Sequence, residues 1–106
     1  MKGLFDLSGK VALVSGGSSG LGADAALAYA KAGADVAVLA RRINKLEETK
    51  QRIQSETGRK VIAVECDVTS EDSIKSAVQA VLNQFGKIDI LLNDAGVAVH
   101  GSVETM

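Results

Sequence analysis

The sequence has few of the residue types on which several other classes of protein depend. It contains one cysteine, Cys66, so no internal disulfide can form, which is typical of a reducing compartment such as the cytoplasm. Nothing near Cys66 in the sequence would stabilise a thiolate, so we expect a small buried residue rather than a nucleophile. The single histidine, His100, excludes metal sites built from several histidines, and a hydrolase triad would depend on it alone. We expect His100 to be exposed in a loop.

A strong charge of one sign and long apolar runs are also missing. The formal net charge is −1, and lysines and arginines are dispersed among acids, so no basic face for nucleic acid is expected. No apolar run approaches the length of a membrane-spanning helix, and residues 1–10 lack the hydrophobic centre of a signal peptide. With 106 residues, 46% of them hydrophobic, and no proline, the sequence predicts one globular cytoplasmic domain without a membrane or nucleic-acid partner.

A glycine-rich stretch is the most informative feature that the sequence does contain. The apolar run from Val11 to Val14 is typical of a strand buried on both faces, and Gly16, Gly20 and Gly22 follow it. A Cβ atom at Gly16 or Gly20 would block the close approach of a pyrophosphate, and one at Gly22 would push the next helix off the strand. The N-terminus of that helix favours an anion. A Walker A loop is excluded, because no lysine follows these glycines at the required spacing.

Strand and helix patterns alternate along the chain. Strands are predicted at residues 11–14, 35–40, 61–65 and 88–93, and the last ten residues, from Val97, are expected to form a loop. The order β-α-β-α-β-α-β predicts an α/β fold with a parallel, doubly wound sheet of the Rossmann type. The expected strand order for this part of such a sheet is 3-2-1-4.

Capping residues and glycines mark the ends of the predicted helices. The second helix is predicted to begin with an Asn44 cap and to end at Gly58. The third is predicted to begin with a capping box formed by Thr69 and Asp72 and to end at Gly86. The apolar face of the third helix is expected to contain Ile74, Ala77, Val78, Val81, Leu82 and Phe85.

Two loops are expected to meet at one edge of the sheet. The loops from Gly16 to Gly22 and from Asn93 to Gly96 each follow a strand, and the strand order reverses between those two strands. Ligands of doubly wound sheets bind in the crevice at this switch point, outside the carboxyl ends of the strands. The convergence of both loops predicts a dinucleotide site there.

The residues after the second strand carry positive charge. That strand ends in Leu39-Ala40-Arg41-Arg42, without an acid at this point. An NAD site normally has an acid here for the ribose 2′-hydroxyl, whereas a 2′-phosphate requires positive charge. Arg41 and Arg42 therefore favour NADP over NAD, and they count against an S-adenosylmethionine site. The alternative is that both arginines merely begin a solvated helix.

The residues after the third strand suit an adenine ring. Asp67 could accept a hydrogen bond from the adenine amino group, and Val68 could pack on the ring. The alternative is that Asp67 simply helps to begin the next helix.

Taken together, these motifs resemble those of the short-chain dehydrogenase/reductase family. The stretch from Ser15 to Gly22 resembles that family's Thr-Gly-x-x-x-Gly-x-Gly cofactor loop, with serine in place of threonine. Asp67-Val68 resembles its adenine-contacting pair, and Asn93-Asp94-Ala95-Gly96 resembles its Asn-Asn-Ala-Gly loop. The resemblance spans nearly the whole chain. Within the family, the sequence is similar to the N-terminal half of gluconate 5-dehydrogenases and 3-oxoacyl-acyl-carrier-protein reductases.

The resemblance implies a role for each matching residue. The glycine-rich loop would hold the pyrophosphate and the nearby ribose, the two arginines the 2′-phosphate, the Asp-Val pair the adenine, and the last loop the sugar side. Asp94 departs from the family's second asparagine and brings a negative charge close to an anionic ligand. The implied cofactor-binding residues are Gly16, Ser18, Ser19, Gly20, Leu21, Gly22, Arg41, Arg42, Asp67, Val68, Asn93, Asp94, Ala95 and Gly96.

The family's catalytic residues have no counterpart in this sequence. The family uses a serine and a Tyr-x-x-x-Lys pair, but the one tyrosine here, Tyr29, has Gly33 four residues on, and the chain stops at Met106. The resemblance therefore implies that residues 1–106 form a single dinucleotide-binding domain, truncated before the catalytic segment and without catalytic or metal-binding residues. In its intact form it would transfer hydride between NADP(H) and a small alcohol or ketone. The alternative is a catalytically silent nucleotide-binding module that acts through self-assembly or a partner.

An exposed strand edge is a further expectation. If the chain ends after the fourth strand, residues 90–92 lie along an open edge that can pair with another chain. We therefore expect the isolated chain to self-associate.

Overall fold

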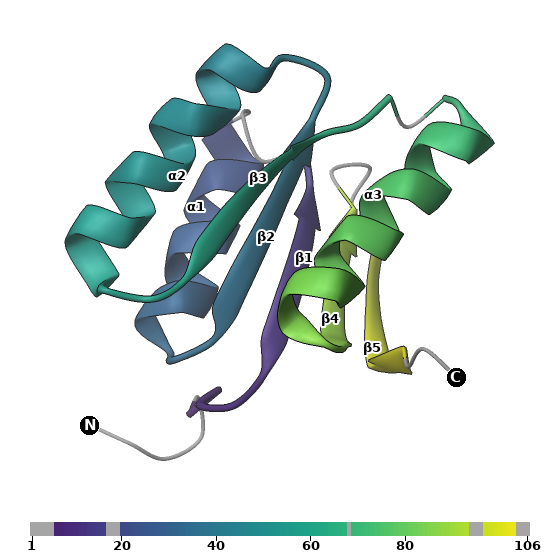
Figure 1. Ribbon diagram of the computed structural model, residues 1–106. Coiled ribbons are helices and arrows are strands. Elements are labelled where there is room, and N and C mark those ends of the chain that lie inside the picture. The colour runs from purple at the N-terminus through teal and green to yellow at the C-terminus, as the bar shows by residue number, and fades with distance from the viewer. Residues whose placement is uncertain (1–5, 17–19, 68, 94–96, 104–106) are drawn as a thin grey trace.

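Strands and helices alternate along the chain in the computed structural model, as the sequence pattern predicts (Figure 1). The structure describes residues 6–16, 20–67, 69–93 and 97–103. The strands are β1 (Val11–Ser15), β2 (Asp35–Ala40), β3 (Val61–Glu65), β4 (Ile88–Asn93) and β5 (Val97–Val103), and the helices are α1 (Gly20–Lys31), α2 (Ile43–Thr57) and α3 (Glu71–Phe85).

The strands form one sheet in the order β3-β2-β1-β4-β5. The first four strands are parallel, so the predicted parallel order 3-2-1-4 is confirmed. In this parallel part, β1 lies between β2 and β4, with Val14 in register with both Val38 and Leu92. This arrangement is the Rossmann-like α/β architecture expected from the sequence.

The prediction of a loop from Val97 onward is wrong, because residues 97–103 form β5. This strand runs antiparallel to β4, from the pair Asn93 and Val97 to the pair Ile88 and Val103. Valines at positions 97, 99 and 103 follow a period-two pattern that favours a strand, with Gly101 at the remaining position of that series. The expected open edge at residues 90–92 is also wrong, since β5 pairs with it. The self-association argued from that edge stays a prediction.

The helices cover the two faces of the sheet unequally. Helices α1 and α2 lie on one face and α3 lies on the other (Figure 1). Side chains of β1 alternate between the two faces: Ala12 and Val14 join the core under α1 and α2, whereas Val11 and Leu13 join the core under α3. Strands β1 and β2 are thus buried on both faces, as the apolar run predicted.

Two of the predicted helix starts are wrong by one or two residues. Helix α2 begins directly after Arg42, which precedes the predicted Asn44 cap and makes no side-chain capping hydrogen bond. Helix α3 is capped by Ser70, whose Oγ accepts a hydrogen bond from the N–H of Ser73 at 3.2 Å, in place of the predicted Thr69–Asp72 box. Thr69 does not cap because its hydroxyl donates to Asp67 Oδ1 at 2.6 Å.

The inner face of α3 is narrower than predicted. Ala77 and Val81 are buried against the sheet, and Val78, Leu82 and Phe85 pack around them, so these five members of the predicted apolar face are confirmed. Ile74 is exposed, so its prediction as an inward residue is wrong. The burial of α3 begins at Ala77, almost one turn after Ile74. None of the helices in the described part of the chain is both long and apolar enough to span a bilayer.

Candidate functional site

The glycine-rich turn lies at the carboxyl end of the central strand β1. Gly16 has a φ of 81°, a left-handed conformation that favours glycine, and its N–H donates to the carbonyl oxygen of Leu39 at 2.7 Å. Helix α1 then begins at Gly20, and Gly22 is buried in its first turn. Ser18 and Ser19 lie outside the described residues. A turn without a Cβ atom at Gly16, next to a helix N-terminus, is a geometry that admits a phosphate group.

The N-terminus of α2 carries positive charge that nothing in its first turn compensates. Arg41 and Arg42 are both exposed between β2 and α2. The first turn of α2, all of which the structure describes, contains no acid, and the cap residue Arg42 makes no side-chain capping bond. Cations near a helix N-terminus oppose the helix dipole, typically by about 0.3–1 kcal/mol each. The end of β2 therefore suits an anionic ligand.

The end of β3 holds a carboxylate in a defined position. The N–H of Cys66 donates to Ala40 O at 2.9 Å, which places the residues after β2 and β3 side by side. Asp67 Oδ1 accepts hydrogen bonds from the N–H of Thr69 at 3.0 Å and from its hydroxyl at 2.6 Å. The N–H of Asp67 donates to Ser73 Oγ at 2.9 Å, so the first turn of α3 supports it.

These contacts affect the acidity of Asp67. The two hydrogen bonds from Thr69, the hydroxyl first, lower the pKa of the Asp67 carboxyl, desolvation opposes them, and Arg41 adds a smaller lowering effect. The carboxylate is therefore negatively charged at neutral pH. Its oxygen Oδ1 is 3.9 Å from Nε of Arg41.

The remaining predicted site residues follow one another from the end of β4. Asn93 is the last residue of β4, which pairs with β1, so it lies at the same edge of the sheet as Gly16. Asp94, Ala95 and Gly96 lie outside the described residues, as does Val68 after β3. The structure thus brings the ends of four parallel strands to one edge, and every predicted site residue that it describes lies at that edge.

The structure also places the single cysteine and the single histidine of the sequence. Cys66 is a buried member of the core under α3, as predicted. His100 lies in β5, opposite Ile90, so its prediction as a loop residue is wrong.

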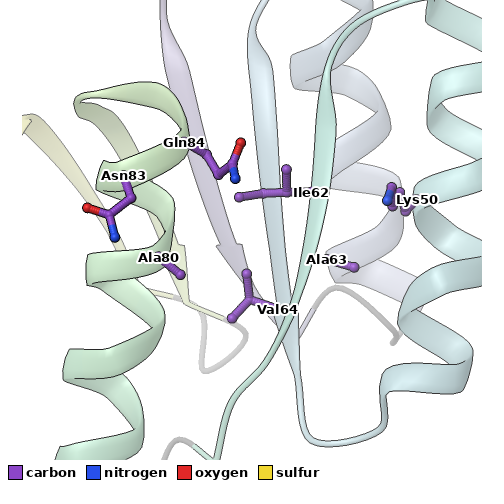
Figure 2. Close-up of a pocket in the computed structure, with 7 residues that line it drawn as sticks. All are labelled: Lys50, Ile62, Ala63, Val64, Ala80, Asn83 and Gln84. Atoms are coloured by element: carbon purple, nitrogen blue, oxygen red, sulfur yellow. The ribbon is translucent and has the colours of Figure 1, made fainter.

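A shallow groove of about 390 Å³ lies away from this edge, along the outer side of β3 (Figure 2). Ile62, Ala63 and Val64 of β3 lie between side chains of α2 and α3 in this view. It is lined by Lys50, Ile62, Ala63, Val64, Ala80, Asn83 and Gln84. None of these is a predicted cofactor-binding residue.

The comparison with known families identifies the class of protein. The sequence model described as short chain dehydrogenase matches residues 10–106. The chain therefore belongs to the short-chain dehydrogenase family, which confirms the resemblance carried by its motifs.

Individual relatives agree with this assignment. The chain is 41% identical over 105 residues to a 12alpha-hydroxysteroid dehydrogenase from a Clostridium species, covering 93% of this chain and 40% of that enzyme. L-Sorbose reductase from Gluconobacter frateurii, solved with NADPH and L-sorbose, has a TM-score of 0.82 at 36% identity, covering 88% of this chain and 35% of that one. NAD⁺-bound xylitol dehydrogenase has a TM-score of 0.78, also at 36% identity, covering 80% and 32%. The chain thus spans two fifths or less of these relatives.

Sequence reasoning missed the hydrogen bonds that hold Asp67. Ser73 lies six residues after Asp67, on the first turn of α3, and its hydroxyl accepts from the N–H of Asp67. The run of hydroxyl residues at 69, 70 and 73 was the available signal, since such side chains often bond to nearby backbone. From the sequence, only Thr69 of this run is predicted to have a role, in the capping box with Asp72.

Proposed function

We propose that this chain is the cofactor-binding part of an NADP(H)-dependent oxidoreductase that interconverts an alcohol and a ketone. The family assignment supports the oxidoreductase class. The named relatives include a hydroxysteroid dehydrogenase, a sorbose reductase and a xylitol dehydrogenase, and these names support a substrate with a hydroxyl or carbonyl group. One of these structures holds NADPH and another NAD⁺, so the choice of NADP(H) rests on this chain's own residues.

The observation that carries the choice of NADP(H) is the positive charge after β2, which the contact between Arg41 and Asp67 offsets only in part. Arg41 and Arg42 are exposed at the N-terminus of α2, without an acid in its first turn. A 2′-phosphate at this position would neutralise the two guanidinium groups and meet the N-terminal end of α2. A ribose 2′-hydroxyl would do neither. The site residues are assigned as the motifs imply, with Gly16 and the start of α1 at the pyrophosphate and Asp67 at the adenine.

The fit of the cofactor to the described residues is favourable at both phosphate positions. The turn at Gly16 has a left-handed φ and precedes a helix N-terminus, which suits the pyrophosphate. When bound, the nicotinamide cofactor supplies the hydride; this chain's residues bind and orient the cofactor. We propose further that residues 1–106 act as one domain that needs additional residues for proton transfer, because the Tyr-x-x-x-Lys pair is absent from them.

Coenzyme titration of the purified chain tests this proposal. NADPH and NADH are titrated separately, with coenzyme fluorescence as the readout, and the ratio of their dissociation constants is compared between variants. Arg41→Ala is expected to weaken NADPH binding about tenfold and NADH binding by less than twofold, because a charged hydrogen bond contributes about 1.5–3 kcal/mol. Arg52→Ala is the matched control: Arg52 lies within α2 and pairs with Glu56 at 3.1 Å.

The alternative, a catalytically silent nucleotide-binding module, predicts the same binding but differs in turnover. Saturable NADPH binding that Arg41→Ala weakens supports the cofactor assignment. An unchanged ratio of dissociation constants in Arg41→Ala would refute the 2′-phosphate site. NADPH oxidation with a panel of small ketones, measured on the chain and on any longer product of the same reading frame, separates the two functions. Activity in neither would favour the silent module.

A further inference from the structure

A fixed carboxylate lies beside the arginine that we assign to the 2′-phosphate, and the inference drawn from it rests on the proposed function. Nε of Arg41 is 3.9 Å from Oδ1 of Asp67. The adjacent strand ends keep the two residues together, because the N–H of Cys66 donates to Ala40 O at 2.9 Å. The two side chains thus share the space outside the ends of β2 and β3.

The two partners are held very differently. The Asp67 carboxylate accepts two hydrogen bonds from Thr69, and its backbone N–H is bonded to Ser73 Oγ. The Arg41 side chain is 71% exposed, compared with 42% for Asp67. A long exposed arginine can turn toward a new partner, whereas a carboxylate with several hydrogen bonds cannot move aside when an anion arrives.

The contact between Arg41 and Asp67 is electrostatic and does not orient the guanidinium group. At 3.9 Å the nitrogen and oxygen lie beyond hydrogen-bond distance, so the pair does not fix the orientation of the guanidinium group. Orientation of Arg41 toward an incoming phosphate is therefore not the main effect of Asp67. The main effect is electrostatic: the carboxylate already neutralises part of the positive charge of Arg41 that a phosphate would use.

We propose that Asp67 is a specificity-determining residue, whose carboxylate competes with the 2′-phosphate of NADP(H) for Arg41 and narrows the preference of the site for NADP(H) over NAD(H). This role is separate from a contact with adenine. Adenine is common to both coenzymes, so any loss of that contact changes both dissociation constants equally. The ratio of the NADH constant to the NADPH constant isolates the effect on the 2′-phosphate.

The test is a cycle of four proteins: the wild-type chain, Asp67→Asn, Arg41→Ala and the double variant. Asparagine keeps an oxygen that can accept the two Thr69 hydrogen bonds and removes only the charge. An exposed ion pair changes an equilibrium constant by up to about fivefold, so Asp67→Asn is expected to raise the ratio about three- to fivefold in favour of NADPH. In the Arg41→Ala background the same change is expected to have less than a twofold effect.

Asp72→Asn is the matched control, since Asp72 is an exposed acid in the first turn of α3. It removes the same charge and is expected to leave the ratio unchanged. Thermal melts of all four proteins and of the control variant check that each is folded.

Each outcome decides between the proposals. If Arg41→Ala lowers the ratio of the NADH constant to the NADPH constant but Asp67→Asn leaves it unchanged or lowers it, the competition by Asp67 is refuted. The assignment of Arg41 to the 2′-phosphate is then retained. An equal rise in the Arg41→Ala background also refutes the competition, because Asp67 would then act on the phosphate without Arg41. A ratio insensitive to Arg41→Ala alone, or the absence of binding by either coenzyme, refutes the proposed function itself.

Discussion

The pairing of β1 with β4 begins with a side chain, and this feature supports a sharp prediction about stability. Oδ2 of Asp89 accepts a hydrogen bond from the N–H of Val11 at 2.9 Å and lies 3.1 Å from Nζ of Lys87. Val11 is 4% exposed, and the Asp89 side chain is 13% exposed. Asp89 stands one position before Ile90, whose register partner is Ala12. The carboxylate therefore supplies the acceptor for a buried N–H at the start of the central strand.

The expected loss of stability follows from what each substitution leaves behind. Asp89→Ala removes the acceptor and leaves the N–H of Val11 buried without its partner. Hydrogen bonds to charged groups contribute about 1.5–3 kcal/mol, so we expect a loss of about 2 kcal/mol in the free energy of unfolding at pH 7. Asp89→Asn can still offer an oxygen but loses the charge and the attraction of Lys87, for which we expect a loss of about 1 kcal/mol.

The difference between wild type and Asp89→Asn is expected to depend on pH. Desolvation raises the pKa of the Asp89 carboxyl, but the hydrogen bonds from Val11 and Lys87 and the nearby lysine charges outweigh it, so the pKa lies below its ordinary value of 3.8. A depressed pKa in the folded state means that the stabilisation is fully present above the unfolded value and disappears as the pH falls through the folded value. The difference should therefore be constant from pH 5 upward and shrink below about pH 4.

Urea unfolding followed by circular dichroism, at several pH values between 3 and 7, measures both effects. Glu71→Gln is the control, because Glu71 forms an exposed ion pair with Lys75 at 3.7 Å, for which a loss below about 0.5 kcal/mol is expected. The reasoning is refuted if Asp89→Ala loses no more than Glu71→Gln at pH 7. It is also refuted if the loss in Asp89→Asn grows, rather than shrinks, at acid pH.

Three further predictions concern packing and helix ends, and each is read from thermal or urea unfolding. Gly33→Ala should lower the free energy of unfolding by well over 1 kcal/mol, because φ is 111° and a Cβ atom would lie 2.9 Å from Ser8 Oγ and 3.0 Å from Ser8 N. Gly58→Ala, where φ is 72° and no described atom beyond the chain neighbours lies within 4 Å of the new Cβ, should lower it by about 1 kcal/mol. Equal losses in the two variants would contradict this prediction. Ser70→Ala should cost about 1 kcal/mol through loss of the α3 cap, and no loss would show that another residue caps the helix. Val81→Ala should lower the free energy of unfolding by about 2 kcal/mol and Ile74→Ala by less than about 0.5 kcal/mol, because Val81 is buried and Ile74 is exposed. A larger loss for Ile74→Ala than for Val81→Ala would contradict this prediction.

The order of the sheet could be predicted because its signals are local and strong. Strands β2, β3 and β4 have the predicted bounds, and each is a mostly apolar stretch of five or six residues. Alternation with helices then implies parallel pairing and right-handed crossovers, which leave few possible strand orders. The ends of α2 and α3 were predictable for the same reason, since Gly58 and Gly86 adopt left-handed conformations there.

The starts of the helices were harder to predict, because neighbouring polar residues compete for the same role. Thr69 and Ser70 are both suitable caps in the sequence. The choice depends on Asp67, whose carboxylate takes the Thr69 hydroxyl and leaves Ser70 to cap α3. Strand β5 was missed for a related reason: its period-two pattern is short and contains Gly101, and its pairing with β4 is a tertiary interaction.

The residues of the candidate site could be proposed from the sequence, but the contact between Arg41 and Asp67 could not be predicted from it. The motifs placed Arg41 after β2 and Asp67 after β3, and strand order placed them on neighbouring strands. Their contact depends also on the rotamer of Asp67, which its bonds to Thr69 determine. Local motifs report which residue types are present, whereas the distance between two side chains on different strands needs the folded sheet.

Acidic side chains at the starts of the parallel strands have close partners, whereas Arg41 at the carboxyl ends has not. Substitutions at the two ends should therefore affect different properties, stability at the starts and coenzyme binding at the carboxyl ends. At the starts of the strands, acids have basic and backbone partners: Asp89 binds Val11 N–H and Lys87, and Asp35 lies 3.3 Å from Nη2 of Arg59. At the carboxyl ends, Arg41 has only a loose partner and adds to an uncapped helix N-terminus. Charge left uncompensated on a folded protein lowers stability unless a ligand uses it. Asp89→Asn should therefore lower the melting temperature without changing the ratio of NADH to NADPH dissociation constants, whereas Arg41→Ala should change the ratio and leave the melting temperature unchanged or slightly higher.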